Sequence, residues 1–282
     1  MSVKIIADST CDLTPEIIKQ LEIEVIPLYV NMGDYSLLDG VDVTPRQVID
    51  WSDHFKTTPK TAAPNTKVIQ DVFARYLAQE NEVVCITIGS GFSATYQSAL
   101  LAAQELGDEP VFVVDSMNLS SGGGHLVMLA AEWAQQGLAA AEIAARVEAL
   151  RPKVRASFVV DTLTFLHRGG RCSAISAFGA SALQLKPQIY VQDGKMEVGR
   201  KFRGSTRKVV QAYCEAVLKD IETIDPRRVF VTVSPADPVL AETAMEIVRG
   251  KNYFEEVILT QAGAVITSHC GPNTLGVLFL EK

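Results

Sequence analysis

Short apolar runs alternate with longer amphipathic segments along the first half of the chain. The runs are rich in β-branched residues and end in polar or Gly-containing turns, as buried strands do; they cover 3–7, 24–30, 83–88 and 111–114. The segments after them have helical spacing, at 66–77, 94–105 and 126–136. Strands that alternate with helices predict a mainly parallel sheet with helices on its faces.

The second half mixes helices with antiparallel strands. Asp193-Gly194 between two alternating runs is typical of a two-residue hairpin. A helix is predicted at 206–220, and strands at 229–233, 257–260 and 275–280. Pro152 ends the amphipathic helix at 139–150, and we place a domain boundary just after it. The sequence therefore predicts two α/β domains, 1–154 with a mainly parallel sheet and 155–282 with a mixed sheet.

Composition and charge exclude several classes of protein. Hydrophobic residues make up 48% of the 282 residues, enough for a large core without metal or disulfide support. The net charge of −7 argues against a nucleic-acid partner, which usually requires a basic surface. No apolar stretch reaches the roughly 18 residues of a membrane span, and the first residues are not typical of a signal peptide. The five cysteines are widely spaced without a C-x-x-C pair, so we expect reduced thiols in a cytoplasmic protein.

The turn Gly89–Ala94 is the first candidate for chemistry, because it follows a strand and opens a helix whose free N–H groups attract anions. It fits a dinucleotide-binding pattern, with Asp115 in the place of a ribose-binding acid. It also resembles the nucleophile elbow of a serine hydrolase, with Ser93, Asp237 and His269 in the order of that fold. The third interpretation is a non-catalytic anion site at Ser93, and the simplest is that Ser93 only caps the helix.

Three other segments carry polar groups suited to a binding site. Thr61 is predicted on a loop before the helix at 66–77, which is either an ordinary entry into that helix or a position from which its hydroxyl donates into a cleft; the residue alone does not decide between them. The predicted turn at 167–171 contains Arg168 and Arg171, and paired arginines commonly bind anions or dock partners. A single histidine is more often structural than catalytic, but His269 is predicted on a Gly/Pro turn after a strand, where it is a better functional candidate than on an apolar face.

Together these segments resemble the DegV family, the fatty-acid-binding subunits of bacterial fatty acid kinase. The resemblance covers about residues 3–281 as one unit, and its motifs occur in the family's order: IADST at the start, Thr61 with Pro64, GFSATYQSA at 91–99, LHRGGR at 166–171, Lys186-Pro187 followed by DGK at 193–195 and Arg203, and SHCGP at 268–272. The chain departs from the family pattern at Ala62-Ala63, where Ser-Gln is usual, and at Ala94, where Gly is usual.

The resemblance implies two α/β domains with a ligand cleft between them that buries one long-chain fatty acid. It places the carboxylate against Thr61, Ser93 and His269, and it places Arg171 and Arg203 at the head group or at a kinase-docking face. It implies no catalytic residue, cofactor or metal in this chain. The acid would instead be presented to an ATP-dependent kinase subunit, which makes the acyl phosphate. The partners expected are thus a fatty acid and a kinase, with no nucleic acid and at most transient membrane contact.

Overall fold

The computed structural model describes residues 2–172 and 185–282. Its first sheet is parallel throughout, with the strand order β2-β1-β6-β7. These strands are β1 (Ser2–Asp8), β2 (Glu24–Ile26), β6 (Asn81–Thr87) and β7 (Val111–Asp115). The second sheet is mixed, with the order β10-β9-β8-β13-β11-β12. Its strands are β8 (Val154–Val159), β9 (Lys186–Gln192), β10 (Lys195–Phe202), β11 (Ile224–Val233), β12 (Glu256–Gln261) and β13 (Leu275–Glu281). The predicted α/β class, with a parallel first sheet and a mixed second one, is therefore confirmed.

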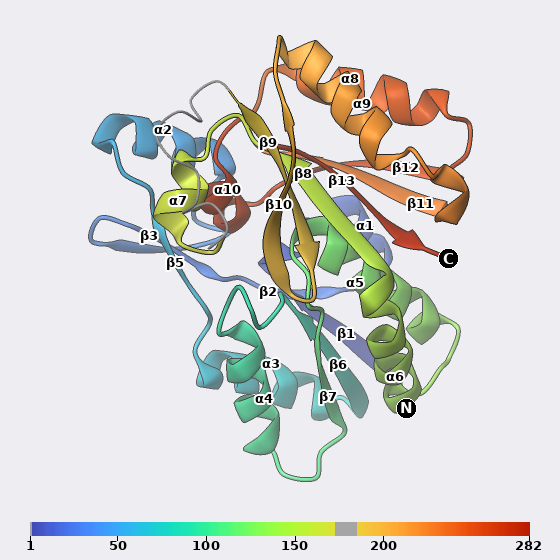
Figure 1. Cartoon of the computed structure of the whole chain (residues 1–282). Coiled ribbons are helices and arrows are strands. Elements are labelled where there is room, and N and C mark those ends of the chain that lie inside the picture. The colour runs from blue at the N-terminus through green and yellow to red at the C-terminus, as the bar shows by residue number, and fades with distance from the viewer. Residues whose placement is uncertain (1, 173–184) are drawn as a thin grey trace.

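Helices separate and cover the two sheets (Figure 1). One outer layer packs on the parallel sheet and consists of α3 (Thr66–Leu77) and α4 (Thr95–Gln104). The other outer layer packs on the mixed sheet and consists of α8 (Thr206–Val217) and α9 (Pro238–Gly250). The layer between the sheets contains α5 (Ser120–Gln135) and α6 (Ala140–Leu150). The shorter helices are α1 (Pro15–Gln20), α2 (Pro45–Phe55), α7 (Thr164–Gly169) and α10 (Ala264–Cys270), with 3-10 turns at Ser9–Cys11, Arg151–Lys153 and Ile221–Thr223.

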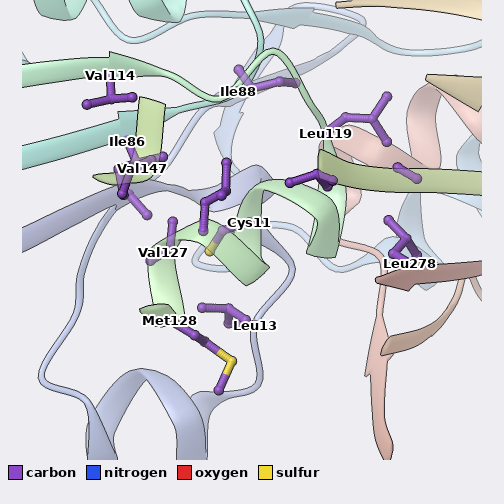
Figure 2. Close-up of a cluster of buried hydrophobic side chains, with 14 of the residues drawn as sticks. Cys11, Leu13, Ile86, Ile88, Val114, Leu119, Val127, Met128, Val147 and Leu278 are labelled. Atoms are coloured by element: carbon purple, nitrogen blue, oxygen red, sulfur yellow. The ribbon is translucent and has the colours of Figure 1, made fainter. Parts of the chain in front are cut away.

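The central helix α5 connects the two sheets through one continuous apolar core. Figure 2 shows Ile86 and Val114, from the parallel sheet, on one side of this helix and Leu278, from β13, on the other. Close packing at its start requires glycine: a Cβ on Gly124 would lie 2.3 Å from the carbonyl oxygen of Cys11. None of the described helices is long and apolar enough to cross a bilayer.

The domain boundary predicted at 154/155 falls at the first residue of β8. Because α5 packs against β1 on one side and β13 on the other, the two predicted domains share one core. The shared core does not mark a boundary at this point, and the division into residues 1–154 and 155–282 stays a prediction.

Several local predictions differ from the structure. The strand predicted at 24–30 is two strands, β2 and β3 (Tyr29–Met32), because Pro27 between them has no N–H for a sheet ladder. No strand is predicted between residues 31 and 82, yet this part of the chain contributes β4 (Tyr35–Leu38) and β5 (Lys60–Ala62) to a small antiparallel sheet with the order β4-β3-β5. The α5 helix begins at Ser120 rather than at 126, so it includes the Gly-rich segment before that position.

Candidate functional site

A cavity of about 260 Å³ lies between the carboxyl end of the parallel sheet and the mixed sheet. From β1 the chain first adds β2 on one side and later adds β6 on the other, so the sheet has a switch point between β1 and β6. Ligands of open α/β sheets bind outside the carboxyl ends of the strands at such a point. The wall of the cavity is mainly apolar and comes from both halves of the chain: Leu28, Ile88, Phe92, Leu119, Phe158, Leu166, Met196, Val265, Ile266 and Leu278. Thr61, Ser93, Arg171 and His269 line the same cavity, so the structure brings together four of the five predicted site residues.

Thr61 and His269 are in direct contact across the cavity. Thr61 belongs to β5, where it pairs with Val30 of β3, so it does not lie on the predicted loop. His269 lies in the last turn of α10, not on a turn after a strand. The Thr61 hydroxyl oxygen lies 2.8 Å from Nε2 of His269, which is hydrogen-bond distance. Two residues separated by 208 positions in sequence thus form one polar pair.

The environment of His269 keeps its ring neutral. Burial is the main cause that lowers its pKa to about 4, and the positive charges of Arg171 and Lys60 contribute to the same shift. Nδ1 is buried without a hydrogen-bond partner among the described residues, and it faces Gly169, where a Cβ would lie only 2.4 Å away. We therefore assign the ring proton to Nε2, because a proton on Nδ1 would be a buried, unsatisfied donor.

This tautomer decides what Thr61 can do. When Nε2–H of His269 donates to the Thr61 hydroxyl oxygen, the Thr61 O–H keeps its own proton and can donate it to a ligand. Lys60 and Arg171 add positive potential beside this donor. An uncharged donor next to two cations favours a carboxylate over a cation or a neutral amide.

Ser93 contributes a second hydroxyl from the turn before α4. Its Oγ lies 2.8 Å from the Thr95 hydroxyl and accepts a hydrogen bond of 3.3 Å from the Thr95 backbone N–H. The cap position of α4 itself is taken by Ala94, so Ser93 is not the N-cap that residue type alone suggested, although it accepts from the first N–H of the helix and also lines the cavity. Because the first turn of α4 is adjacent, the positive end of the helix dipole lies on the same side of the cavity.

The two predicted arginines have different positions. Arg171 lines the cavity and donates to the carbonyl oxygens of Gly169 at 2.8 Å and Phe92 at 3.5 Å. It thereby connects the end of α7 to the turn that carries Ser93. Arg203 is exposed between β10 and α8 and does not line the cavity. The segment 167–171 is also not a simple turn, because α7 extends to Gly169 and Gly170 ends it in the left-handed conformation.

The geometry does not assemble the relay of a serine hydrolase among the described residues. His269 contacts Thr61 rather than Ser93, and its other ring nitrogen has no carboxylate partner. Asp237 is exposed and caps α9, where it accepts from the Val239 N–H at 3.0 Å. A base that is not oriented by an acid, and does not reach the nucleophile, lacks the arrangement that such catalysis needs.

The dinucleotide interpretation also lacks its expected group, a free ribose-binding acid. Asp115 accepts hydrogen bonds from the N–H and hydroxyl of Ser90, at 3.0 and 2.5 Å, and from the Met117 N–H, so its carboxylate holds the turn itself. Within residues 2–172 and 185–282, no three His, Cys, Asp or Glu side chains are grouped as metal ligands would be. The described cysteine thiols, all buried, form no disulfide.

Sequence reasoning missed Lys60. It precedes Thr61 directly, and its Nζ lies 3.4 Å from the carbonyl oxygen of Arg168, close enough to His269 to lower the histidine pKa. A lone lysine beside a threonine carries no signal in the sequence. Only the fold shows that it lies beside His269.

Comparisons with known proteins agree over the full length of the chain. A family model described as "Uncharacterised protein, DegV family" matches residues 2–282. A DegV domain-containing protein of Clostridium acetobutylicum is 32% identical over 280 residues, covering 99% of each chain. The structure of a DegV family protein from Thermus thermophilus, described as fatty acid binding, has a TM-score of 0.91 at 31% identity and covers 100% of both chains. A stearic acid-binding protein of Eubacterium ventriosum has a TM-score of 0.84 at 26% identity, covering 99% of this chain and 98% of its own.

Proposed function

The chain belongs to the DegV family, and from this membership and the cavity we propose that it binds a long-chain fatty acid. The acyl chain would occupy the apolar part of the cavity, with its carboxylate at Thr61, Ser93 and His269. The observation that carries the proposal is the Thr61–His269 pair, which leaves a hydroxyl donor beside two cations in a mainly apolar cavity.

The energetics of such a ligand favour a tight but reversible complex. Burying about fourteen methylenes at about 0.8 kcal/mol each gives roughly 11 kcal/mol. Ordering the chain and restricting the free ligand cost several kcal/mol, which leaves affinity in the micromolar range or tighter. The apolar wall therefore supplies most of the affinity, while the head-group residues orient the carboxylate.

The finer part of the proposal is that the protein does no chemistry of its own and presents the carboxylate to an ATP-dependent kinase. It rests on the resemblance of the motifs. In support, the described polar groups around the carboxylate position are neutral hydroxyls and a neutral imidazole, with cations nearby. Such donors hold a carboxylate without transferring a proton to it, so the oxygen remains a nucleophile for phosphorylation. Arg203, which is exposed, is the proposed docking residue for the kinase.

The first experiment asks whether a fatty acid is bound at all. The purified protein is examined by native mass spectrometry, and the ligand is identified after organic extraction. We expect a co-purifying acid of fatty-acid mass, or binding of added palmitate to the emptied protein. A protein that neither retains nor binds an acid would refute the proposal.

A second measurement tests the head-group residues. Ser93→Ala and Thr61→Ala should each weaken palmitate binding about tenfold to a hundredfold, since each removes a hydrogen bond to a charged group worth roughly 1.5–3 kcal/mol. The double variant should lose less than the sum, because both hydroxyls hold one carboxylate. Ser205→Ala is the matched control: it removes an exposed hydroxyl at the start of α8 that makes no capping bond. Wild-type affinity in both single variants would contradict the head-group assignment.

A further inference from the structure

The helix that carries His269 begins on two buried carboxylates. The backbone N–H of Gly263 donates to Oδ1 of Asp12 at 2.8 Å, and that of Ala264 donates to Oδ1 of Asp39 at 2.7 Å. Asp12 and Asp39 are only 5% and 3% exposed. The first N–H groups of a helix have no partner within it, so these carboxylates satisfy donors that would otherwise be buried unpaired.

Each carboxylate is itself fixed from the other half of the chain. The second oxygen of Asp39 accepts from the Ser9 hydroxyl at 2.8 Å, and the backbone N–H of Asp39 donates to the carbonyl oxygen of Leu28 at 2.9 Å. The second oxygen of Asp12 accepts from the Ser120 hydroxyl at the start of α5. The position of both carboxylates is thus set by the loop after β1, the chain before β3 and the central helix.

Gly263 allows this double contact. A Cβ at this position would lie 3.2 Å from Oδ1 of Asp12 and 3.2 Å from both oxygens of Asp39. That is closer than ordinary van der Waals contact. The absence of a side chain therefore lets two carboxylates approach the start of one helix.

The arrangement has an energetic cost that a simple cap would avoid. Burial raises the pKa of both Asp12 and Asp39, which means that the charged forms are disfavoured inside the protein. An exposed Asp caps α9 with a comparable bond of 3.0 Å and no such burial. Capping alone does not explain why two carboxylates are buried at the start of a helix of seven residues.

Because α10 is short, the contacts at its first residues affect the position of His269 near its end. His269 lies five residues after Ala264, about 7.5 Å along the helix axis, so displacing one end displaces the other. The far end is confined as well, because a Cβ on Gly271 would meet the Phe165 ring at 2.6 Å. Val265, Ile266 and His269, all on this helix, line the cavity.

We propose that Asp39 and Asp12 are positioning residues of the head-group site, which act through α10 to hold His269 at hydrogen-bond distance from Thr61. The proposal rests on the proposed fatty-acid binding for its affinity readout, but not for its structural one. Neither carboxylate lines the cavity, so their effect on a ligand passes through the helix.

The test compares Asp39→Ala with Asp39→Asn, which keeps the oxygen that accepts from Ala264. Affinity is measured for palmitate and for hexadecanol, which has the same chain without a carboxylate. The ring ¹⁵N signals and the pKa of His269 are followed by NMR in the ligand-free protein. We expect Asp39→Ala to weaken palmitate about tenfold, to weaken hexadecanol much less, and to move the His269 signals, with its pKa rising from about 4 toward the ordinary value. Asp39→Asn should restore most of each property.

Asp237→Ala is the matched control, because it also removes an aspartate that caps a helix, on α9 and away from the cavity. It should leave palmitate affinity and the His269 signals unchanged. If Asp39→Ala does not fold, Gly263→Ala takes its place, since its methyl group would displace the start of α10 without removing a charge.

The proposal would be overturned by unchanged His269 signals in the folded variant, or by equal losses for palmitate and hexadecanol, which would indicate a general collapse of the cavity. A wild-type protein that binds no palmitate would refute the proposed function instead. In that case the His269 signals of the ligand-free variants still decide whether the carboxylates position the ring.

Discussion

Gly169→Ala should weaken binding of the ligand head group much more than it changes the free energy of unfolding. Gly169 is the last residue of α7, and its Cα lies against the ring of His269. An added Cβ would lie 2.4 Å from Nδ1, whereas ordinary contact begins at 3.4 Å, so the ring must retreat by 3.4 − 2.4 = 1.0 Å. A ring held at one nitrogen by Thr61, at 2.8 Å, and pressed at the other by a methyl group cannot keep both contacts.

The expected magnitudes follow from this geometry. If His269 no longer orients Thr61, a hydrogen bond to the carboxylate worth roughly 1.5–3 kcal/mol is lost, so palmitate binding should weaken about tenfold to a hundredfold. Stability should change less, because replacing glycine by alanine in a helix gains about 1 kcal/mol, which offsets part of an overpacking cost of about 1–3 kcal/mol.

Isothermal titration with palmitate measures the first effect and denaturant unfolding the second. Gly250→Ala is the matched control: Gly250 is likewise the last residue of its helix, α9, and a Cβ there would meet no atom within 4 Å. It should leave binding unchanged. Undiminished palmitate binding by a folded Gly169→Ala protein would refute the argument that the His269–Thr61 contact belongs to the head-group site.

Two further predictions concern pH and partner recognition. Burial, together with the charges of Arg171 and Lys60, lowers the pKa of His269 to about 4 in the folded protein, whereas the unfolded ring takes a proton at its ordinary pKa of about 6.5. The free energy of unfolding should therefore fall as the pH drops below about 6.5, and this residue should account for about 1.4 kcal/mol between pH 8 and 5.5. Denaturant unfolding of the wild type and of His269→Gln across this pH range isolates the contribution of the histidine. The buried carboxylates with raised pKa change the free energy of unfolding in the opposite direction, but they do so equally in both proteins. Parallel pH curves for the two proteins would argue against a buried neutral His269. Arg203→Ala should leave palmitate affinity unchanged, because Arg203 does not line the cavity, and should lower acyl-phosphate formation by a partner kinase; loss of palmitate binding in this variant would contradict the docking role.

Local patterns in the sequence determined the types and order of most elements. Thr14-Pro15 begins α1 and Thr44-Pro45 begins α2, each through a side-chain cap with proline in the first turn. Asp193-Gly194 forms the hairpin between β9 and β10, with both residues at positive φ. Such signals act between residues that are near neighbours in sequence, which is why they can be read without the fold.

Signals that depend on distant partners could not be read in this way. The segment 264–270 has the β-branched residues of a strand, yet it forms a helix, because Asp12 and Asp39 accept its first N–H groups. Pro27 divides a run that otherwise reads as one strand, and only the pairing shows that its halves belong to different sheets. Here tertiary contacts override local propensity.

The candidate site depends on both levels. The residue patterns offered Ser93 and Arg171 as candidates for anion binding, and the resemblance placed Thr61 and His269 with Ser93 at one carboxylate. Their meeting at one cavity, the contact of Lys60 with the same spot and the exposure of Arg203 came from the packing of two sheets around α5. A 2.8 Å contact between residues 208 positions apart is set by the whole core between them, because no local rule of the chain specifies where two distant segments meet.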